Sequence, residues 1–383
     1  MTRAAVVVAA LALAGLAGAA GPTPGGRPIV LGGCDPLYYE RVGMPQRLIV
    51  SDLPMEDTAH TAMHQMTQAI KLTLKERGFR AGRFSVGYVA CDDSGPAGHW
   101  SAARCVRNAR LAARHPKVVG EIGTLDSGCA RAALPALARR GLPLVSPLNT
   151  ADDLTRGRRA DVARLSATDS AQAAAAARYL EGAGARRVAA LSDGTPRGDV
   201  FRAAFARAAG QIGLRLVSGR ADAAYVGGVL AGPTRTTLDT ARKRAGDGPL
   251  ALSSGYGPAA QLADTAGSAA EGALLFVAGV PVERLGVPGR DFVRRFEESI
   301  GRSPHPYAVY AAQAAQLLLD AVERSGGSRA QVARAVLHAR EARGLIGAFA
   351  FDRNGDARPA AVTIFRVEGR STEIVRVVNS GIP

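Results

Sequence analysis

The chain has 383 residues, of which 47% are hydrophobic and 21% charged, and its formal net charge is +15. This length is enough for about two domains, and the apolar content excludes bulk disorder. The basic residues are almost all arginines spread along the chain rather than gathered in a stripe with aromatics, so a nucleic-acid partner is not expected.

Residues 1–20 have the pattern of a secretory signal peptide. A short basic start, Met1–Arg3, precedes an apolar run from Ala4 to Leu16, and Ala17-Gly18-Ala19 offers small residues for cleavage. The run is too short to span a membrane. We therefore expect an exported protein, periplasmic or at the cell surface, with residues 21–46 as a Gly/Pro-rich linker.

Four cysteines follow the predicted signal: Cys34, Cys91, Cys105 and Cys129. An even count in an exported chain favours two disulfides, with three alternative connectivities. Cys34 also has a second interpretation, because Leu31-Gly32-Gly33-Cys34 resembles a lipoprotein-processing box. In that case Cys34 would be a lipid-anchored N-terminus.

Strands and helices alternate from about residue 47 to Ser146. Each expected strand is short and apolar, and each expected helix has apolar positions at helical spacing. This alternation predicts a doubly wound parallel sheet, whose ligands bind beyond the carboxyl ends of the strands. Three loops at the carboxyl ends of strands should line one crevice: Ser51–Asp57, Gly123–Gly128 and Ser146–Thr150. The expected strands are Leu48–Val50, Phe84–Val89, Val118–Ile122 and one ending at Val145–Ser146, and the expected helices are Ala59–Arg77, Ser101–Arg114 and one ending at Arg140.

The pattern restarts after Arg164 and becomes β-rich at the end. Only Ser218–Asp222 joins two expected strands, Leu214–Val217 and Ala223–Val226. A parallel crossover needs a dozen or more residues. Either a helix is missing here, or these strands are not parallel neighbours. The other expected strands are Val188–Leu191, Leu250–Leu252, Leu274–Ala278 and a meander of Ala348–Phe351, Val362–Val367 and Thr372–Val378; the expected helices are Ala171–Leu180, one ending at Gly210, Asp291–Ile300, Ala308–Arg324 and Ala330–Arg340.

An ordered set of loop sequences resembles the type I periplasmic binding proteins, and within them the branched-chain amino-acid binding proteins of ABC importers. The resemblance covers roughly residues 47–370. It implies an α/β fold of two Rossmann-like lobes joined by a three-crossing hinge, with lobe 1 at 47–165 plus 285–345 and lobe 2 at 166–284 plus 346–383. The matching segments are Val50–Pro54, Cys91–Ser94, Gly123–Cys129, Ser146–Thr150, Val277–Pro281, Pro306–Ala314 and Phe349–Asp356.

The resemblance also implies a ligand site between the lobes. Ser127, followed by Gly128, matches the serine that holds a ligand carboxylate through its hydroxyl and backbone N–H. After Ser146-Pro147, Asn149 and Thr150 match residues that offer a carbonyl to the ligand ammonium and a hydroxyl. An alternative is that Ser127 and Thr150 only cap helices.

The second lobe departs from the family pattern. Arg197 stands before Gly198 where the family carries an aromatic residue, and it could pair with an extra ligand carboxylate or simply face solvent. The family's acidic partner for the ligand ammonium lies in the segment between the two closely spaced expected strands, where this chain has only Ser218-Gly219-Arg220-Ala221-Asp222. Tyr256 is the remaining nearby aromatic.

Within this family fold, Cys105 and Cys129 lie at neighbouring ends of a βαβ unit. A Cys105–Cys129 disulfide is therefore the hypothesis, which leaves Cys34–Cys91 as the second pair.

Enzymatic motifs are missing from the expected places. No Gly-x-Gly-x-x-Gly follows the first strand, and the chain has no Gly-x-Ser-x-Gly. His60 and His64 have the spacing of metal ligands, but we expect them to face solvent at the start of a helix. We expect Asp92-Asp93 to form a turn. We expect no enzyme, cofactor or metal. The expected function is capture of a small amino-acid-like molecule for an ABC permease, and the alternative is a degenerate fold acting as a ligand sensor or protein-interaction module.

Overall fold

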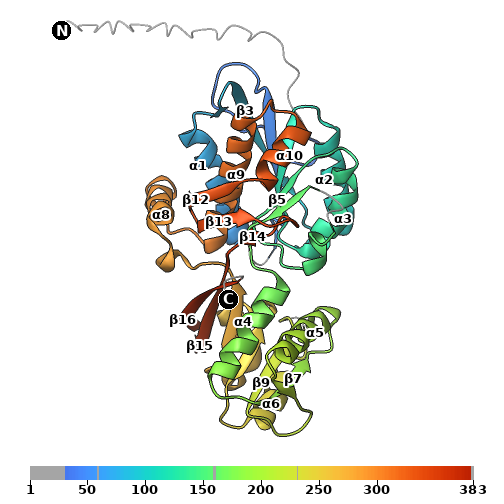
Figure 1. Cartoon of the computed structure of the whole chain (residues 1–383). Helices are drawn as coiled ribbons and strands as arrows, with labels where there is room; N and C mark the ends of the chain where they lie inside the picture. The colour runs from blue at the N-terminus through green and yellow to red at the C-terminus, as the bar shows by residue number, and fades with distance from the viewer. Residues whose placement is uncertain (1–30, 58–59, 158–160, 231, 381–383) are drawn as a thin grey trace, which may run out of the picture.

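The computed structural model describes residues 31–57, 60–157, 161–230 and 232–380. It has two lobes, one above the other in Figure 1, each built on a twisted sheet covered by helices. The expected α/β fold of two Rossmann-like lobes is confirmed. The predicted signal peptide and the first part of the predicted linker lie outside the described residues.

The sheet of lobe 1 is six-stranded, in the order β2-β3-β1-β4-β5-β6. Its strands pair in parallel except for β2, which pairs with β3 in an antiparallel manner. All seven residues of β1 except the first are buried, as expected of a central strand covered on both faces. The strands are β1 (Arg47–Leu53), β2 (Arg80–Ala81), β3 (Phe84–Asp92), β4 (Val118–Gly123), β5 (Leu144–Ser146) and β6 (Val162–Arg164).

Helices from both ends of the chain cover this sheet. One apolar cluster joins the sheet to α1 (His60–Glu76), α9 (Pro306–Arg324) and α10 (Arg329–Leu337), and another joins it to α2 (Ala102–Arg114) and α3 (Ser127–Ala138). The late helices therefore return to lobe 1, as Figure 1 shows in orange beside blue α1. Small side chains on α9, such as Ala311 and Ala315, allow its close approach to the sheet. Next to it lies α8 (Val287–Ile300).

The sheet of lobe 2 is seven-stranded, in the order β16-β15-β11-β10-β9-β7-β8. One apolar cluster joins it to α4 (Asp169–Gly182) and α5 (Pro196–Gln211), and another to α6 (Thr234–Ala245) and α7 (Ala259–Ala266). The strands are β7 (Arg187–Ser192), β8 (Arg215–Leu216), β9 (Ala223–Gly227), β10 (Leu250–Ser253), β11 (Leu274–Ala278), β15 (Ala360–Glu368) and β16 (Ser371–Ser380), and the short 3₁₀ helices of the molecule are η1 (Asp152–Leu154), η2 (Ser254–Tyr256), η3 (Gly267–Ala270) and η4 (Val282–Arg284).

The short segment between β8 and β9 has a simple topological explanation. Both strands pair in parallel with β7, on opposite sides of it, so they are not neighbours. Because β8 ends after two residues, the chain passes the amino-terminal end of β7, where the Asp222 N–H donates to the carbonyl of Arg187. This route needs no helix.

The C-terminal meander is divided between the lobes. Strands β12 (Arg340–Gly344), β13 (Gly347–Phe351) and β14 (Ala357–Arg358) form a separate small sheet, and Phe349 and Ala357 pack into the lobe 1 core. The chain joins the lobe 2 sheet only at Ala360, the first residue of β15. The change of lobe therefore comes later than the expected boundary at residue 346.

Residues 31–46 are packed on lobe 1 rather than forming a free linker. Leu31 is buried, and Tyr38 exchanges backbone hydrogen bonds with Tyr88 of β3. Cys34 is bonded to Cys91 through its sulfur. The lipid-anchor interpretation of Cys34 needs the same sulfur and is incompatible with this bond. No helix in the described ranges is sufficiently long and apolar to cross a membrane.

Candidate functional site

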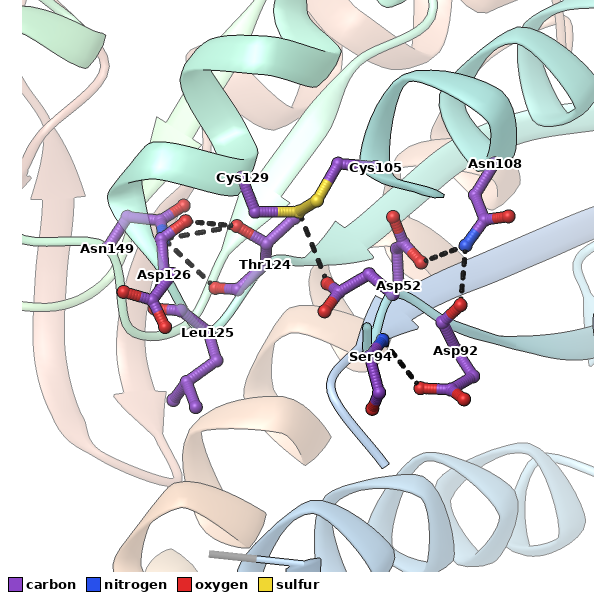
Figure 2. Close-up of a disulfide and its surroundings, with 11 residues drawn as sticks. Asp52, Asp92, Ser94, Cys105, Asn108, Thr124, Leu125, Asp126, Cys129 and Asn149 are labelled. Atoms are coloured by element: carbon purple, nitrogen blue, oxygen red, sulfur yellow. Dashed lines mark hydrogen bonds between the residues drawn. A yellow bond between two sulfur atoms is a disulfide. The ribbon is translucent and has the colours of Figure 1, made fainter. Parts of the chain in front are cut away.

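Asn149 ties together two loops at the carboxyl edge of the lobe 1 sheet. Its side-chain nitrogen donates to the carbonyls of Thr124 and Leu125 in the loop after β4, at 3.0 and 3.1 Å. Its side-chain oxygen accepts from the Ser146 hydroxyl at 2.9 Å. Both Asn149 and Ser146 are buried. These two predicted site residues therefore hold the loops in place, and Figure 2 shows the bonds from Asn149 to the Thr124–Leu125 segment.

Ser127 begins α3 and faces the loop after β5. Its Oγ accepts the backbone N–H groups of Thr150 and Ala151, at 3.3 and 3.2 Å. The structure thus brings together Ser127 and Thr150, as the sequence predicted. Because the oxygen acts as an acceptor in both bonds, the hydroxyl proton remains available to a further partner.

Asp126 precedes Ser127 and was not predicted as a site residue. It occupies the N-cap of α3, yet its carboxylate caps no N–H group of the helix, and it forms no ion pair or side-chain hydrogen bond with any residue in the described ranges. Burial, and then the nearby Asp57, raise the pKa of Asp126, whereas Arg197 and His99 act in the opposite direction. In Figure 2 its carboxylate points away from the Cys105–Cys129 disulfide.

Arg197 connects the second lobe to this loop. It lies in the first turn of α5, and its Nη2 donates to the Thr150 hydroxyl at 3.0 Å. Both terminal nitrogens also donate to the fully buried carboxylate of Asp169, and the guanidinium stacks over the Phe201 ring. The alternative that Arg197 simply faces solvent is wrong, because the side chain has three partners within the protein: Asp169, Thr150 and Phe201.

Tyr256 lies within lobe 2 and is fully buried. Its hydroxyl lies against Gly228 and has no hydrogen-bond partner among the described residues. The carboxylate of the neighbouring Asp193 already has hydrogen-bond partners. It accepts from the N–H groups of Thr195 and Val229 and from the Thr195 hydroxyl. The carboxyl-edge loops of lobe 2 therefore close on themselves in this arrangement.

Two aromatic residues near α3 were missed in the sequence. A side chain at Gly128 would lie 2.5 Å from the Trp100 ring, so the glycine lets the indole cover the first turn of the helix. Tyr307, at the start of α9, is close enough to Asp126 for that carboxylate to raise its pKa further, after burial. Leu125 and Leu148 add half-buried apolar surface around the same loops.

A set of buried carboxyl groups lies behind the loops, at the ends of β1, β3 and β4. Desolvation raises the pKa of Asp93 to about 9 and that of Glu121 to about 8, and it also raises the pKa of Asp52. Both oxygens of Glu121 lack a hydrogen-bond partner in the described parts of the chain. Asp52 is supported by the Asn108 amide at 2.7 Å, as Figure 2 shows. Burial therefore favours the neutral form of these carboxyl groups.

Of the three alternative cysteine connectivities, the structure contains Cys34–Cys91 and Cys105–Cys129, as hypothesised. The second disulfide fixes the first turn of α3 to α2. The Oδ2 of Asp93 lies 3.2 Å from the Cys129 sulfur. A disulfide sulfur carries no proton, so a hydrogen bond between them must be donated by the neutral Asp93 carboxyl.

Asp93, Cys105 and Cys129 also form the one cluster with metal-ligand spacing in the described ranges. Metal binding by cysteine needs thiolates, and both of these cysteines are oxidised to a disulfide, so their donor set does not fit a metal ion. His60 and His64 are exposed on α1. Asp92 accepts the N–H groups of Met55 and Ser94, which fits its predicted role in a turn.

The fold agrees with comparisons to known proteins. A family model described as periplasmic binding protein matches residues 57–372, and the chain belongs to this family. The leucine-binding protein LivK from Thermotoga maritima is 24% identical, with a TM-score of 0.72 over 87% of this chain and 99% of that one. No curated protein sequence matches the chain.

Two other solved structures show a similar fold with different ligands. An ABC transporter substrate-binding protein from Desulfitobacterium hafniense, in complex with Leu, is 21% identical and has a TM-score of 0.71 over 86% of this chain and 99% of that one. A solute-binding protein of an ABC transporter from R. palustris, in complex with 4-hydroxybenzoate, is 18% identical, with a TM-score of 0.71 over 88% of this chain and 98% of that one. At these identities the likeness describes the fold.

Proposed function

We propose that this protein is the exported solute-binding component of an ABC importer and holds an amino-acid-like ligand between its lobes. One observation carries the proposal. A hydroxyl donor, Ser127, and a carboxylate without a partner in the described structure, Asp126, stand side by side at the start of α3. These are complementary to the carboxylate and the ammonium of one amino acid.

The carboxylate of such a ligand would bind at the amino-terminal turn of α3. Helix amino termini attract anions because their first N–H groups have no partner within the helix and the helix dipole is positive there. The Asp126 side chain caps none of them. Ser127 adds a hydroxyl proton, because its oxygen already accepts two N–H groups from the loop after β5.

The ammonium would bind Asp126. The family resemblance looks for this acid in the second lobe, in the segment between β8 and β9. The one acid of that short connection, Asp222, is already paired with Arg187. Asp126 supplies the same chemistry from lobe 1. A ligand ammonium would stabilise the ionised form of Asp126 and so counter the burial that raises its pKa.

The remaining surroundings suit an apolar ligand side chain. Leu125, Leu148 and Met55 are half-buried at the same edge of lobe 1, and Trp100 and Tyr307 bring aromatic rings close to α3. Similar structures contain Leu or 4-hydroxybenzoate, which share a carboxylate on an apolar body.

In this proposal Arg197 is not available to bind a second carboxylate on the ligand. Its charge is already compensated by the bidentate contact with Asp169, and its remaining hydrogen bond orients Thr150. Arg197 therefore acts as a positioning residue that fixes the loop holding Ser127. An ABC permease in the membrane would receive the ligand-bound form.

A thermal-shift screen of the mature protein tests the proposal. The panel holds the common amino acids, their desamino carboxylic acids and small dicarboxylates. A ligand at 1,000 times its Kd adds about 4 kcal/mol to the free energy of unfolding, which gives a clear shift. We expect a rise with an apolar amino acid that is lost in Ser127→Ala. A rise with dicarboxylates alone, or no rise from folded protein, would contradict the proposal and favour an interaction module.

A further inference from the structure

A cavity formed by residues of both lobes, which we call the hinge cavity, lies on the side of α4 that faces β15 and β16. Its volume is about 460 Å³, in the range of small-molecule sites. It shares no residue with the loops around Ser127 and Arg197. Lobe 1 contributes residues of η1 and of the β13–β14 turn, and lobe 2 contributes α4, β15 and β16.

The floor of this hinge cavity is apolar. The cavity exists because the sequence of α4 is rich in alanine. Ala171, Ala174 and Ala175 face the cavity opposite Ile364 and Val378. Alanine side chains are too short to fill the space between this helix and the two strands. The result is an open cavity where larger side chains would have formed a core.

The rim of the cavity is cationic. Arg156, Arg178 and Arg376 line it, and none of them forms an ion pair with another residue that the structure describes. A fourth arginine, Arg358, is paired with Asp352 at 3.2 Å. The carboxylates in the lining are Asp152, which accepts from the Ser170 hydroxyl at 2.9 Å, and Asp356, which is paired with Arg164. The exposed arginines leave an excess of positive charge.

We propose that the hinge cavity binds a small organic anion with an apolar body, such as a medium-chain or aryl carboxylate. The apolar floor takes the hydrocarbon part, and Arg178 and Arg376 hold the anionic head. A ligand here contacts both lobes, so its affinity depends on their relative position, and it is coupled to whatever the lobes hold between them.

Calorimetric titration of the intact mature protein with octanoate tests the proposal. Octanamide is the neutral probe of the same shape, and inorganic phosphate is the anion without an apolar body. We expect octanoate to bind and the two controls not to bind. If octanamide binds as well as octanoate, or phosphate does, the combined recognition of anion and apolar body is wrong.

Variants locate the binding. The double variant Arg178→Gln/Arg376→Gln, which changes two exposed arginines, should weaken octanoate binding about tenfold. The reason is that two partly solvated charge contacts are lost. Ala174→Leu should abolish it by filling the floor, with the circular dichroism spectrum unchanged. Arg207→Gln, at an exposed arginine of α5 outside the cavity, is the matched control and should bind normally. Wild-type octanoate affinity in Ala174→Leu, or equal weakening in Arg207→Gln, would overturn the proposal.

Discussion

Arg197 in lobe 2 donates a hydrogen bond to the hydroxyl of Thr150 in lobe 1, at 3.0 Å. Thr150 in turn donates its backbone N–H to Ser127 at the start of α3. The start of α5 in one lobe is thereby linked to the start of α3 in the other. This continuous contact couples the position of the lobes to the geometry of the proposed carboxylate site.

Replacing Arg197 tests this contact. Arg197→Met leaves the fully buried Asp169 carboxylate without its charged partner, and we expect the free energy of unfolding to fall by about 2 kcal/mol. Urea unfolding measures the change. Arg202→Met is the control on the same helix, at an exposed arginine, and should change stability by less than about 0.5 kcal/mol. The double variant Arg197→Met/Asp169→Asn should recover part of the loss; equal effects of Arg197→Met and Arg202→Met would show that the contact contributes nothing.

The buried acids predict a pH dependence of stability. Burial raises the pKa of Asp93 to about 9 and that of Glu121 to about 8 in the folded protein, whereas carboxyl groups in the unfolded chain titrate near about pH 4. Between these values the unfolded state binds fewer protons than the folded state, so stability falls as pH rises from about 4 to about 9.

Denaturant unfolding across this pH range measures the effect. Asp93→Asn and Glu121→Gln remove the ionisable groups but keep similar shapes, and each should flatten the decline. Asp199→Asn, at an exposed position of α5, is the control and should leave the slope unchanged. A wild-type profile that rises over this range, or variants with the wild-type slope, would contradict the assignment.

The Cys105–Cys129 disulfide should stabilise both the lobe and the start of α3. It closes a separation of 24 residues, for which the loss of chain entropy in the unfolded state predicts about 3 kcal/mol. Cys105→Ser/Cys129→Ala should lose about this amount and also bind the ligand more weakly, because Cys129 lies in the first turn of α3. Cys34→Ser/Cys91→Ala is the comparison: it should lower stability but leave affinity nearly unchanged. Equal ligand affinity in the two double variants would show that the Cys105–Cys129 disulfide does not support the ligand site.

Trp100 is the one tryptophan in the sequence, so its fluorescence reports on the start of α3. Gly128→Ala places a methyl group where the indole ring lies, and we expect the ring to move and its emission to shift to longer wavelength. Gly210→Ala, in a helical position with open space around it, is the matched control and should keep the wild-type spectrum. An unchanged spectrum in Gly128→Ala would mean that the ring does not cover this turn.

The sequence predicted the features that depend on local pattern. Alternating apolar runs placed most strands and helices, and the position of the loops at strand ends placed Ser127 and Thr150 along one crevice. A two-residue strand such as β8 is too short to show a periodic pattern. The sequence therefore left two alternatives, a missing helix or strands that are not neighbours, and the structure shows the second, with β8 and β9 on opposite sides of β7. The turn at Asp352–Asp356 looked like part of one meander, but the buried Arg164–Asp356 ion pair holds it on lobe 1.

The candidate site was predicted only in part. Asp126 was passed over because the resemblance places the ammonium partner in the other lobe. Burial at Asp93 and Glu121 arises from tertiary packing around strand ends, and an acidic residue gives no sign of it in the sequence. Arg197 looked like one more surface arginine, since its partner Asp169 lies at the start of a helix 28 residues earlier.

The most direct test of the central claim compares two ligands on two proteins by calorimetry. The ligands are the best amino acid from the screen and its desamino acid, and the proteins are the wild type and Asp126→Asn. The account predicts that the wild type binds the amino acid at least about tenfold more tightly, since a charge-assisted contact contributes 1.5 kcal/mol or more, and that Asp126→Asn removes this preference. Tighter binding of the desamino acid by the wild type, or an unchanged preference in Asp126→Asn, would contradict it.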